Sequence, residues 1–270
     1  MASKSTATVH STASRLADSP VLRGLARAGY VVNGILHIVI GFIALGVAFG
    51  GGGEADQAGA LGELASKPGG LLLLWVITIG LFGLGLFQIV VAFLVRGSDK
   101  DAWADRAKEG GKGIAYLAVG VTALTFAMGG SSDSSSQTEG AASGLLATPG
   151  GVILLVVLGL AVVAVGVYFV IKGAKKKFLE DITLPPGTVG NVTTRLGVAG
   201  YIAKGIAVAI VGLLFIVAAF THDASQASGL DGAIKSLVEL PFGVVILTVV
   251  ALGFMAYGVY CFVRARFARL

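Results

Sequence analysis

One histidine, His37, lies inside an apolar run long enough to cross a membrane, and it is the strongest single candidate for chemistry. A neutral histidine in such a place can relay protons or bind a haem iron. It can also form one hydrogen bond, to a tyrosine or a carbonyl, that locks the packing. We favour packing, because the other two histidines, His10 in the N-terminal tail and His222 in a loop, lie outside the apolar runs and cannot complete a bis-histidine haem site.

Further polar residues fall at matching places in three copies of a repeat that is described below. Tyr116 corresponds to His37, and Lys112 and Lys204 correspond to Asn33, one helical turn before the histidine. Together they predict a polar ring at the cytoplasmic mouth that could receive an anion or a lipid headgroup. The alternative, which we favour, is that the lysines extend to the membrane interface as simple snorkelling side chains.

Two other features invite a functional reading. Gln88 is a single polar residue near the inner end of the second apolar run, where an interhelical hydrogen bond is the expected role. A basic cluster follows the fourth run, and it is compatible with a lipid-headgroup site or with a plain topology anchor. We favour the anchor for its members Lys172, Lys175, Lys176 and Lys177.

Catalytic constellations are missing from the sequence. No Asp or Glu lies within the apolar runs, which argues against transport coupled to protons or cations through carboxylates. The single cysteine, Cys261, excludes an intramolecular disulfide and a cysteine-based metal site, and no zinc-ligand spacing occurs. We therefore expect no enzymatic activity, no metal and no cofactor.

The elements that carry these residues are membrane-spanning helices. The chain has 270 residues, of which 55% are hydrophobic and 13% charged, about half the charge of a typical soluble domain. The deficit comes from six apolar runs, each near the ~20 residues that an α-helix needs to cross the bilayer. They lie at roughly 30–49, 70–95, 113–129, 150–171, 200–220 and 242–263. The predicted fold class is an all-α integral membrane protein with six transmembrane helices.

The distribution of positive charge predicts the orientation of the chain. The N-terminal tail, the connections 96–112 and 172–204 and the C-terminus hold 18 of the 20 Lys and Arg residues. By the positive-inside rule these segments are cytoplasmic. Both termini are therefore expected on the cytoplasmic side of a bacterial plasma membrane. The net charge of +5 is then a topology signal. Anionic headgroups on the cytoplasmic side are the expected contact, and nucleic acid is not.

An internal repeat organises the six runs. The strings GILHIVIG, GIAYLAVG and GIAVAIVG begin the odd runs, and each even run has a glycine 17 residues after a proline and an aromatic residue two positions later. Glycines in membrane helices allow close approach of neighbouring backbones. The expected helix-packing glycines are Gly34, Gly41, Gly113, Gly120, Gly205 and Gly212 in the odd runs and Gly85, Gly166 and Gly258 in the even runs.

The protein is therefore three tandem two-helix hairpins. We place a polar N-terminal tail at 1–22 and the repeats at 23–97, 102–173 and 191–266. Each hairpin begins and ends on the cytoplasmic side, so the copies are parallel repeats and suggest a pseudo-threefold axis along the membrane normal.

The strings YVVNGILHIVIGFIAL (30–45) and ADQAGALGELASKPGG (55–70), with the glycine-to-aromatic pattern of the even runs, resemble the bacterial domain-of-unknown-function family numbered 1206. The resemblance extends from about residue 23 to residue 266 and implies tandem two-helix membrane repeats. It implies no activity. The later copies depart from the motif at Asp56, so any role of that residue is not threefold.

Two functions remain open from the sequence. The first is a non-enzymatic scaffold or accessory subunit of a membrane complex, favoured by the absence of intramembrane charge and by the small loops. The alternative is a transporter or channel for a small apolar or weakly polar solute along the pseudo-threefold axis. Convergence of the odd-helix polar residues on a solvated centre would favour the transporter, and a dry apolar core would oppose it.

Overall fold

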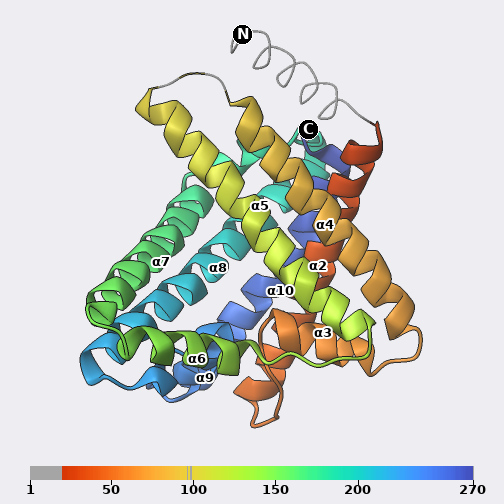
Figure 1. Ribbon diagram of the computed structural model, residues 1–270. Coiled ribbons are helices and arrows are strands. Elements are labelled where there is room, and N and C mark those ends of the chain that lie inside the picture. The colour runs from red at the N-terminus through yellow and green to blue at the C-terminus, as the bar shows by residue number, and fades with distance from the viewer. Residues whose placement is uncertain (1–19, 96, 98, 270) are drawn as a thin grey trace.

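The computed structural model describes residues 20–95, 97 and 99–269, and this part of the chain is a helical bundle (Figure 1). Its six long helices are α2 (Pro20–Ala48), α4 (Gly70–Leu94), α5 (Lys100–Ala127), α7 (Gly151–Ala174), α8 (Gly187–Thr221) and α10 (Gly243–Phe267). Each contains a segment apolar and long enough to cross a membrane. Shorter elements are α3 (Gln57–Ala65), α6 (Ser134–Leu146), α9 (Gly229–Val238), η1 (Lys177–Asp181) and η2 (Ala224–Gln226).

The helices extend further at the basic end than the apolar runs predict. Helix α5 begins at Lys100, thirteen residues before the third run, and α8 begins at Gly187, directly after two prolines. Proline cannot continue a helix from inside, but it is tolerated at the start, and Pro186 is the N-cap of α8. Segments that hydropathy alone assigns to cytoplasmic connections are therefore helical, and this places Lys112 and Lys204 on helices.

The described part of the chain begins within the predicted N-terminal tail. Residues 1–19 of the predicted tail, His10 included, lie outside the described residues. Helix α2 already starts at Pro20 and runs without a break into the first membrane span.

The long helices pack in a cyclic order that follows the repeats. The even helix of each repeat packs on the odd helix of the next: α4 on α5, α7 on α8, and α10 back on α2 (Figure 1). These are the most extensive interfaces of the bundle. The last helix of the chain therefore closes on the first, as a pseudo-threefold arrangement requires.

Glycines form the contact points of these three interfaces. A β-carbon built on any member of the central pairs would lie 2.6–3.1 Å from its partner's carbonyl oxygen, which is tighter than nine in ten real β-carbon contacts. The pairs are Gly34 with Gly258, Gly113 with Gly85, and Gly205 with Gly166. Because only glycine lacks the β-carbon, the backbones can touch there.

The second predicted glycine of each odd helix makes contacts that differ between the three copies. A β-carbon on Gly41 would lie 2.8 Å from the Ala251 carbonyl oxygen, and one on Gly212 would lie 2.6 Å from that of Gly159. At Gly120 the nearest atom, Cβ of Leu81, is 3.5 Å away, an ordinary van der Waals contact. The close approach that the repeat predicts at Gly120 is therefore absent.

The threefold order is broken inside the second repeat. Helices α2 and α4 of the first repeat pack on each other, as do α8 and α10 of the third, but α5 and α7 do not. Figure 1 shows α5 and α7 diverging towards the end of the bundle that carries α6. The bundle is thus a closed cycle of three inter-repeat interfaces with one intra-repeat interface missing.

Short helices cover the end of the bundle opposite the basic connections. The cap of α3 explains Asp56 in the string at 55–70. Asp56 is the N-cap of α3, where its carboxylate accepts the Gly59 N–H at 2.8 Å. Cross-links join the copies: the Ala55 N–H donates to Asp231 at 2.8 Å and the Ser135 hydroxyl to the Ser228 carbonyl at 3.0 Å. The loops of the first and second repeats are thereby both fastened to that of the third.

The core divides into two halves of different chemistry. The half beside α3 and α9 is one continuous apolar cluster of Leu, Ile, Val, Ala and Phe side chains, among them Leu36, Ile40, Ile77, Leu247 and Ile234. The half beside the basic connections is rich in tyrosine and contains the buried polar residues described next.

Candidate functional site

Three of the predicted polar residues meet around α10. Asn33 and His37 come from α2 and Lys204 from α8, and all three approach the segment that holds Tyr257 and Cys261. The Asn33 side-chain amide donates to the Cys261 sulfur at 3.4 Å. We use the term cationic–aromatic cluster for these residues and their charged and aromatic neighbours. Its members are Asn33, His37, Glu109, Lys112, Lys172, Asp181, Tyr201, Lys204, Tyr257, Cys261 and Arg264.

His37 is held by one hydrogen bond and two rings. Its Nδ1 lies 2.8 Å from the carbonyl oxygen of Asn33, one turn earlier on α2. Because a carbonyl oxygen only accepts, Nδ1 carries the ring proton and Nε2 is left as an acceptor. The ring centroid is 4.7 Å from that of Tyr257 and 5.9 Å from that of Phe254, and the residue is 3% exposed. This is the histidine-to-carbonyl geometry of the packing interpretation.

Lys204 is not a simple snorkelling side chain, because its ammonium packs over aromatic rings. Its ammonium lies 4.5 Å from the ring centroid of Tyr257 and 5.5 Å from that of Phe169. No described carboxylate lies within ion-pair distance of it. Lys204 is only partly buried, so a cation–π contact contributes about 0.5–2 kcal/mol. Its ammonium charge has no counter-ion among the described residues.

A second cation, Arg264, enters the cluster from the end of α10. Its guanidinium lies 3.5 Å from the Asp181 carboxylate, donates to the Tyr201 hydroxyl at 3.4 Å, and lies 4.5 Å from the ring centroid of Tyr30. The side chain is 12% exposed, and its Nε is buried without an acceptor among the described residues.

Asp181 is the carboxylate shared by two of these cations. The Lys172 ammonium lies 2.6 Å from Oδ2 of Asp181, the same oxygen that the Arg264 guanidinium approaches. Burial would raise the pKa of this carboxyl, but Arg264 and Lys172 outweigh that effect and hold the pKa below its ordinary value. The position of Asp181 is fixed by η1, where Phe178 stacks on Tyr201 and accepts a hydrogen bond from the Tyr260 hydroxyl at its carbonyl oxygen.

The second repeat contributes through α5. Lys112 donates to both carboxylate oxygens of Glu109, at 2.7 and 2.9 Å. Tyr116 packs against the same core as Tyr30. Tyr116 also packs against the apolar cluster of the other half, so it lies where the two halves of the core meet.

The remaining predicted site residues lie elsewhere or play simpler parts. Gln88 is buried on α4, but the interhelical hydrogen bond that we expected for it is not found among the described residues. The basic cluster divides: Lys172 is buried against Asp181, whereas its other members, Lys175, Lys176 and Lys177, are exposed. The four lysines therefore do not form one surface.

Sequence reasoning missed Arg264, Asp181, Tyr201 and Tyr257. Arg264 was counted only as a topology marker at the C-terminus. A signal was present, because Phe254, Tyr257, Cys261 and Arg264 recur at three- and four-residue steps and so share one face of α10. Nothing in the sequence places Asp181 on that face, since its position depends on how η1 folds back.

The cluster can bind charge, but it is not arranged for metal binding. No group of three His, Cys, Asp or Glu side chains that could hold a metal ion occurs among the described residues. Its donors are ammonium, guanidinium and phenol groups, which favour anions.

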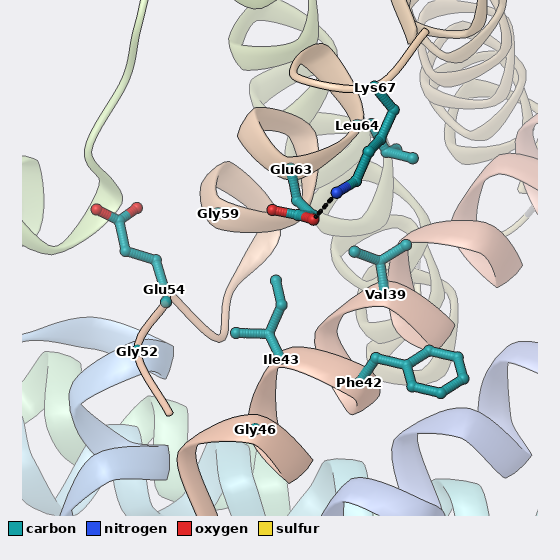
Figure 2. Close-up of a pocket in the computed structure, with 11 residues that line it drawn as sticks. Val39, Phe42, Ile43, Gly46, Gly52, Glu54, Gly59, Glu63, Leu64 and Lys67 are labelled. Atoms are coloured by element: carbon teal, nitrogen blue, oxygen red, sulfur yellow. Dashed lines mark ion pairs between the residues drawn. The ribbon is translucent and has the colours of Figure 1, made fainter. Parts of the chain in front are cut away.

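A separate depression lies at the other end, between α2 and α3 (Figure 2). It has a volume of about 470 Å³ and an apolar wall of Val39, Phe42 and Ile43. Figure 2 shows Glu63 and Lys67 at its rim, paired at 2.8 Å. Glu54 also lines the depression, so its charged groups are two carboxylates and one ammonium. We assign the candidate site to the cationic–aromatic cluster because the predicted polar residues meet there.

Comparison with known proteins gives three findings. The sequence profile of a family described as Domain of Unknown Function (DUF1206) matches the chain three times, over residues 28–94, 109–176 and 199–268. The chain is also 30% identical over 251 residues to the "Uncharacterized protein YxxB" of Bacillus subtilis (strain 168), an alignment that covers 91% of this chain and 90% of that protein. No solved structure matches the chain. Each profile match covers one odd and one even long helix.

Proposed function

The chain belongs to the DUF1206 family, whose model matches it three times, and on that premise we propose that it is a non-enzymatic scaffold or accessory subunit of a membrane complex. We place it in the bacterial plasma membrane with both termini in the cytoplasm. The asymmetry of the basic residues supports this orientation, with anionic headgroups contacting the cytoplasmic side.

The observation that carries the proposal is the parting of α5 and α7. In their most apolar segments these two helices are only 22% and 17% buried within the chain, against 50% for α2, α4 and α10. They are the two helices of the repeat whose internal interface is missing. A repeat that packs on its neighbours but not on itself leaves helix faces that a partner helix can occupy.

The exposed face of α5 has the composition of a helix-docking surface. Gly111, Ala115 and Ala118 are exposed and lie at four- and three-residue steps, so they share one face. A β-carbon built on Gly111 would meet no atom within 4 Å. Small residues allow close approach of a second transmembrane helix, and we expect a helix of the partner to pack here.

Purification from the native membrane tests this proposal. The tagged chain is recovered in mild detergent, and co-purifying membrane proteins are quantified for three forms. We expect a partner with wild type and its loss with the double variant Ala115→Leu/Ala118→Leu. The matched control Ala161→Leu changes an exposed alanine on α7 and should retain the partner. Recovery of wild type alone, or of the same proteins with the double variant, would contradict the proposal.

A second candidate function rests on a different observation. Polar residues from all three repeats converge on the cytoplasmic half of the bundle, whereas the other half is a closed apolar cluster. This is the arrangement of a transporter whose site faces inward, and a solute path would require the apolar half to open. Labelling of Cys261 by a small thiol reagent in right-side-out and inside-out vesicles tests it. Reaction from both sides supports a transporter, and reaction from one side or neither opposes it.

A further inference from the structure

The described residues do not balance the positive charge of the cationic–aromatic cluster. It brings together four cations, one from each of α5, α7, α8 and α10, and two carboxylates: Lys112, Lys172, Lys204 and Arg264 with Glu109 and Asp181. Both carboxylates are engaged, Glu109 by Lys112 and Asp181 by Lys172, at 2.7 and 2.6 Å. An excess of two positive charges remains inside a membrane protein, where unpaired charge is unfavourable.

The excess is located at Lys204 and Arg264. Lys204 has aromatic neighbours and no described carboxylate partner. Arg264 shares Asp181 with Lys172 and keeps a buried Nε without an acceptor among the described residues. The two are joined by rings, since Tyr257 under Lys204 lies edge-on to Tyr201, which accepts from Arg264.

We propose that Lys204 and Arg264 bind a phosphate-bearing anion between them, in the cytoplasmic half of the bundle. A guanidinium offers forked N–H donors and an ammonium three further donors, and together they match the several oxygens of a phosphate group. A carboxylate would offer these donors only two acceptor oxygens. The rings of Tyr257 and Phe169 add an apolar surface beside the anion for the part of the ligand that carries the phosphate. This site goes beyond the role of an accessory subunit.

Two sources supply this chemistry: the headgroup of an anionic phospholipid in the cytoplasmic leaflet, and a free phosphate. The thermal unfolding midpoint of the delipidated full-length chain distinguishes them, because a ligand that binds only the folded state raises it. Separate samples receive phosphatidylglycerol, zwitterionic phosphatidylcholine and inorganic phosphate. A rise with phosphatidylglycerol alone identifies the lipid, and a rise with inorganic phosphate identifies the free anion. No rise with either anion overturns the proposal.

Variants of Lys204 test the assignment to these residues. Lys204→Met keeps the apolar stem against Phe169 and removes the unpaired charge, so we expect it to fold and to bind the anion at least about tenfold more weakly. Lys204→Arg keeps the charge and should keep the shift. The matched control Arg195→Met alters an exposed cation on the same helix and should also keep it. A shift in Lys204→Met equal to that of wild type would overturn the proposal.

Native mass spectrometry gives a readout that does not depend on the stability of any variant. Wild type released from phosphatidylglycerol-containing membranes should retain a phosphate-bearing species that Lys204→Met loses and Arg195→Met retains. Equal retention by all three proteins would contradict the assignment.

Discussion

Gly34 and Gly258 touch backbone to backbone: a β-carbon on either would lie 2.8 or 2.6 Å from the carbonyl oxygen of the other. Gly34 belongs to the first hairpin and Gly258 to the last. Their contact closes the cycle of repeats, and the same pairing recurs between the first and second hairpins and between the second and third.

Substitution of Gly258 by alanine should therefore weaken the fold. The added methyl would collide with the Gly34 carbonyl and with the Ile38 side chain at 2.6 Å, and overpacking of this kind costs about 1–3 kcal/mol. Thermal unfolding in detergent measures the loss. Gly46→Ala is the control, because nothing lies within 4 Å of its added carbon. Equal stability of the two variants would contradict the close packing.

His37→Phe tests whether the histidine serves more than packing. The phenyl ring keeps the contacts with Tyr257 and Phe254 and loses the bond to the Asn33 carbonyl, so we expect a loss of about 1 kcal/mol in unfolding free energy. Growth of a strain carrying the variant should be unchanged. A growth defect with unaltered stability would instead indicate a role in proton transfer or ligand binding.

Asp181 should make the stability of the protein pH-dependent. Its pKa is lowered in the folded state, so its ion pairs stabilise the fold above the ordinary aspartate pKa of about 3.9. This contribution disappears as the pH falls through the lowered value. Asp181→Asn should cost about 1–3 kcal/mol near neutrality and flatten this part of the acid profile. Its exposed neighbour provides the control Glu180→Gln. Identical acid profiles for wild type and Asp181→Asn would refute the assignment.

Asp231 fastens the loop of the third repeat to that of the first. Asp231→Ala leaves the buried Ala55 N–H without its acceptor, for an expected loss of about 1–3 kcal/mol. Lys235→Met removes only the exposed partner of the Asp231–Lys235 ion pair and should cost less than about 1 kcal/mol. Amide hydrogen exchange at Ala55 should accelerate in the first variant alone. Acceleration in both would show that the ion pair, and not the cross-link, orders the loop.

The membrane spans and the repeat can be predicted from the sequence because both depend on local patterns, namely the length of apolar runs and the spacing of glycines. Close backbone contact requires glycine, and Gly85, Gly166 and Gly258 each lie 17 residues after a proline. The missing interface between α5 and α7 cannot be predicted in this way, because valine and leucine side chains pack equally well against lipid and against a neighbouring helix. Lys172 and Arg264 were misread for a related reason: a cation near a helix end looks the same whether it reaches water or is buried against Asp181.

Closure of the first hairpin on the last is the central claim, and the single native cysteine allows a direct test of it. The Asn33 side-chain amide nitrogen lies 3.4 Å from the Cys261 sulfur, so a cysteine at position 33 would lie within reach of a disulfide. The variant Asn33→Cys, carrying a protease site in the connection between α4 and α5, is oxidised in the membrane, cleaved and run on a non-reducing gel. We predict that the two fragments stay linked until reduced, whereas the control Ile35→Cys separates. Separation of the Asn33→Cys fragments without reduction would contradict the closed cycle.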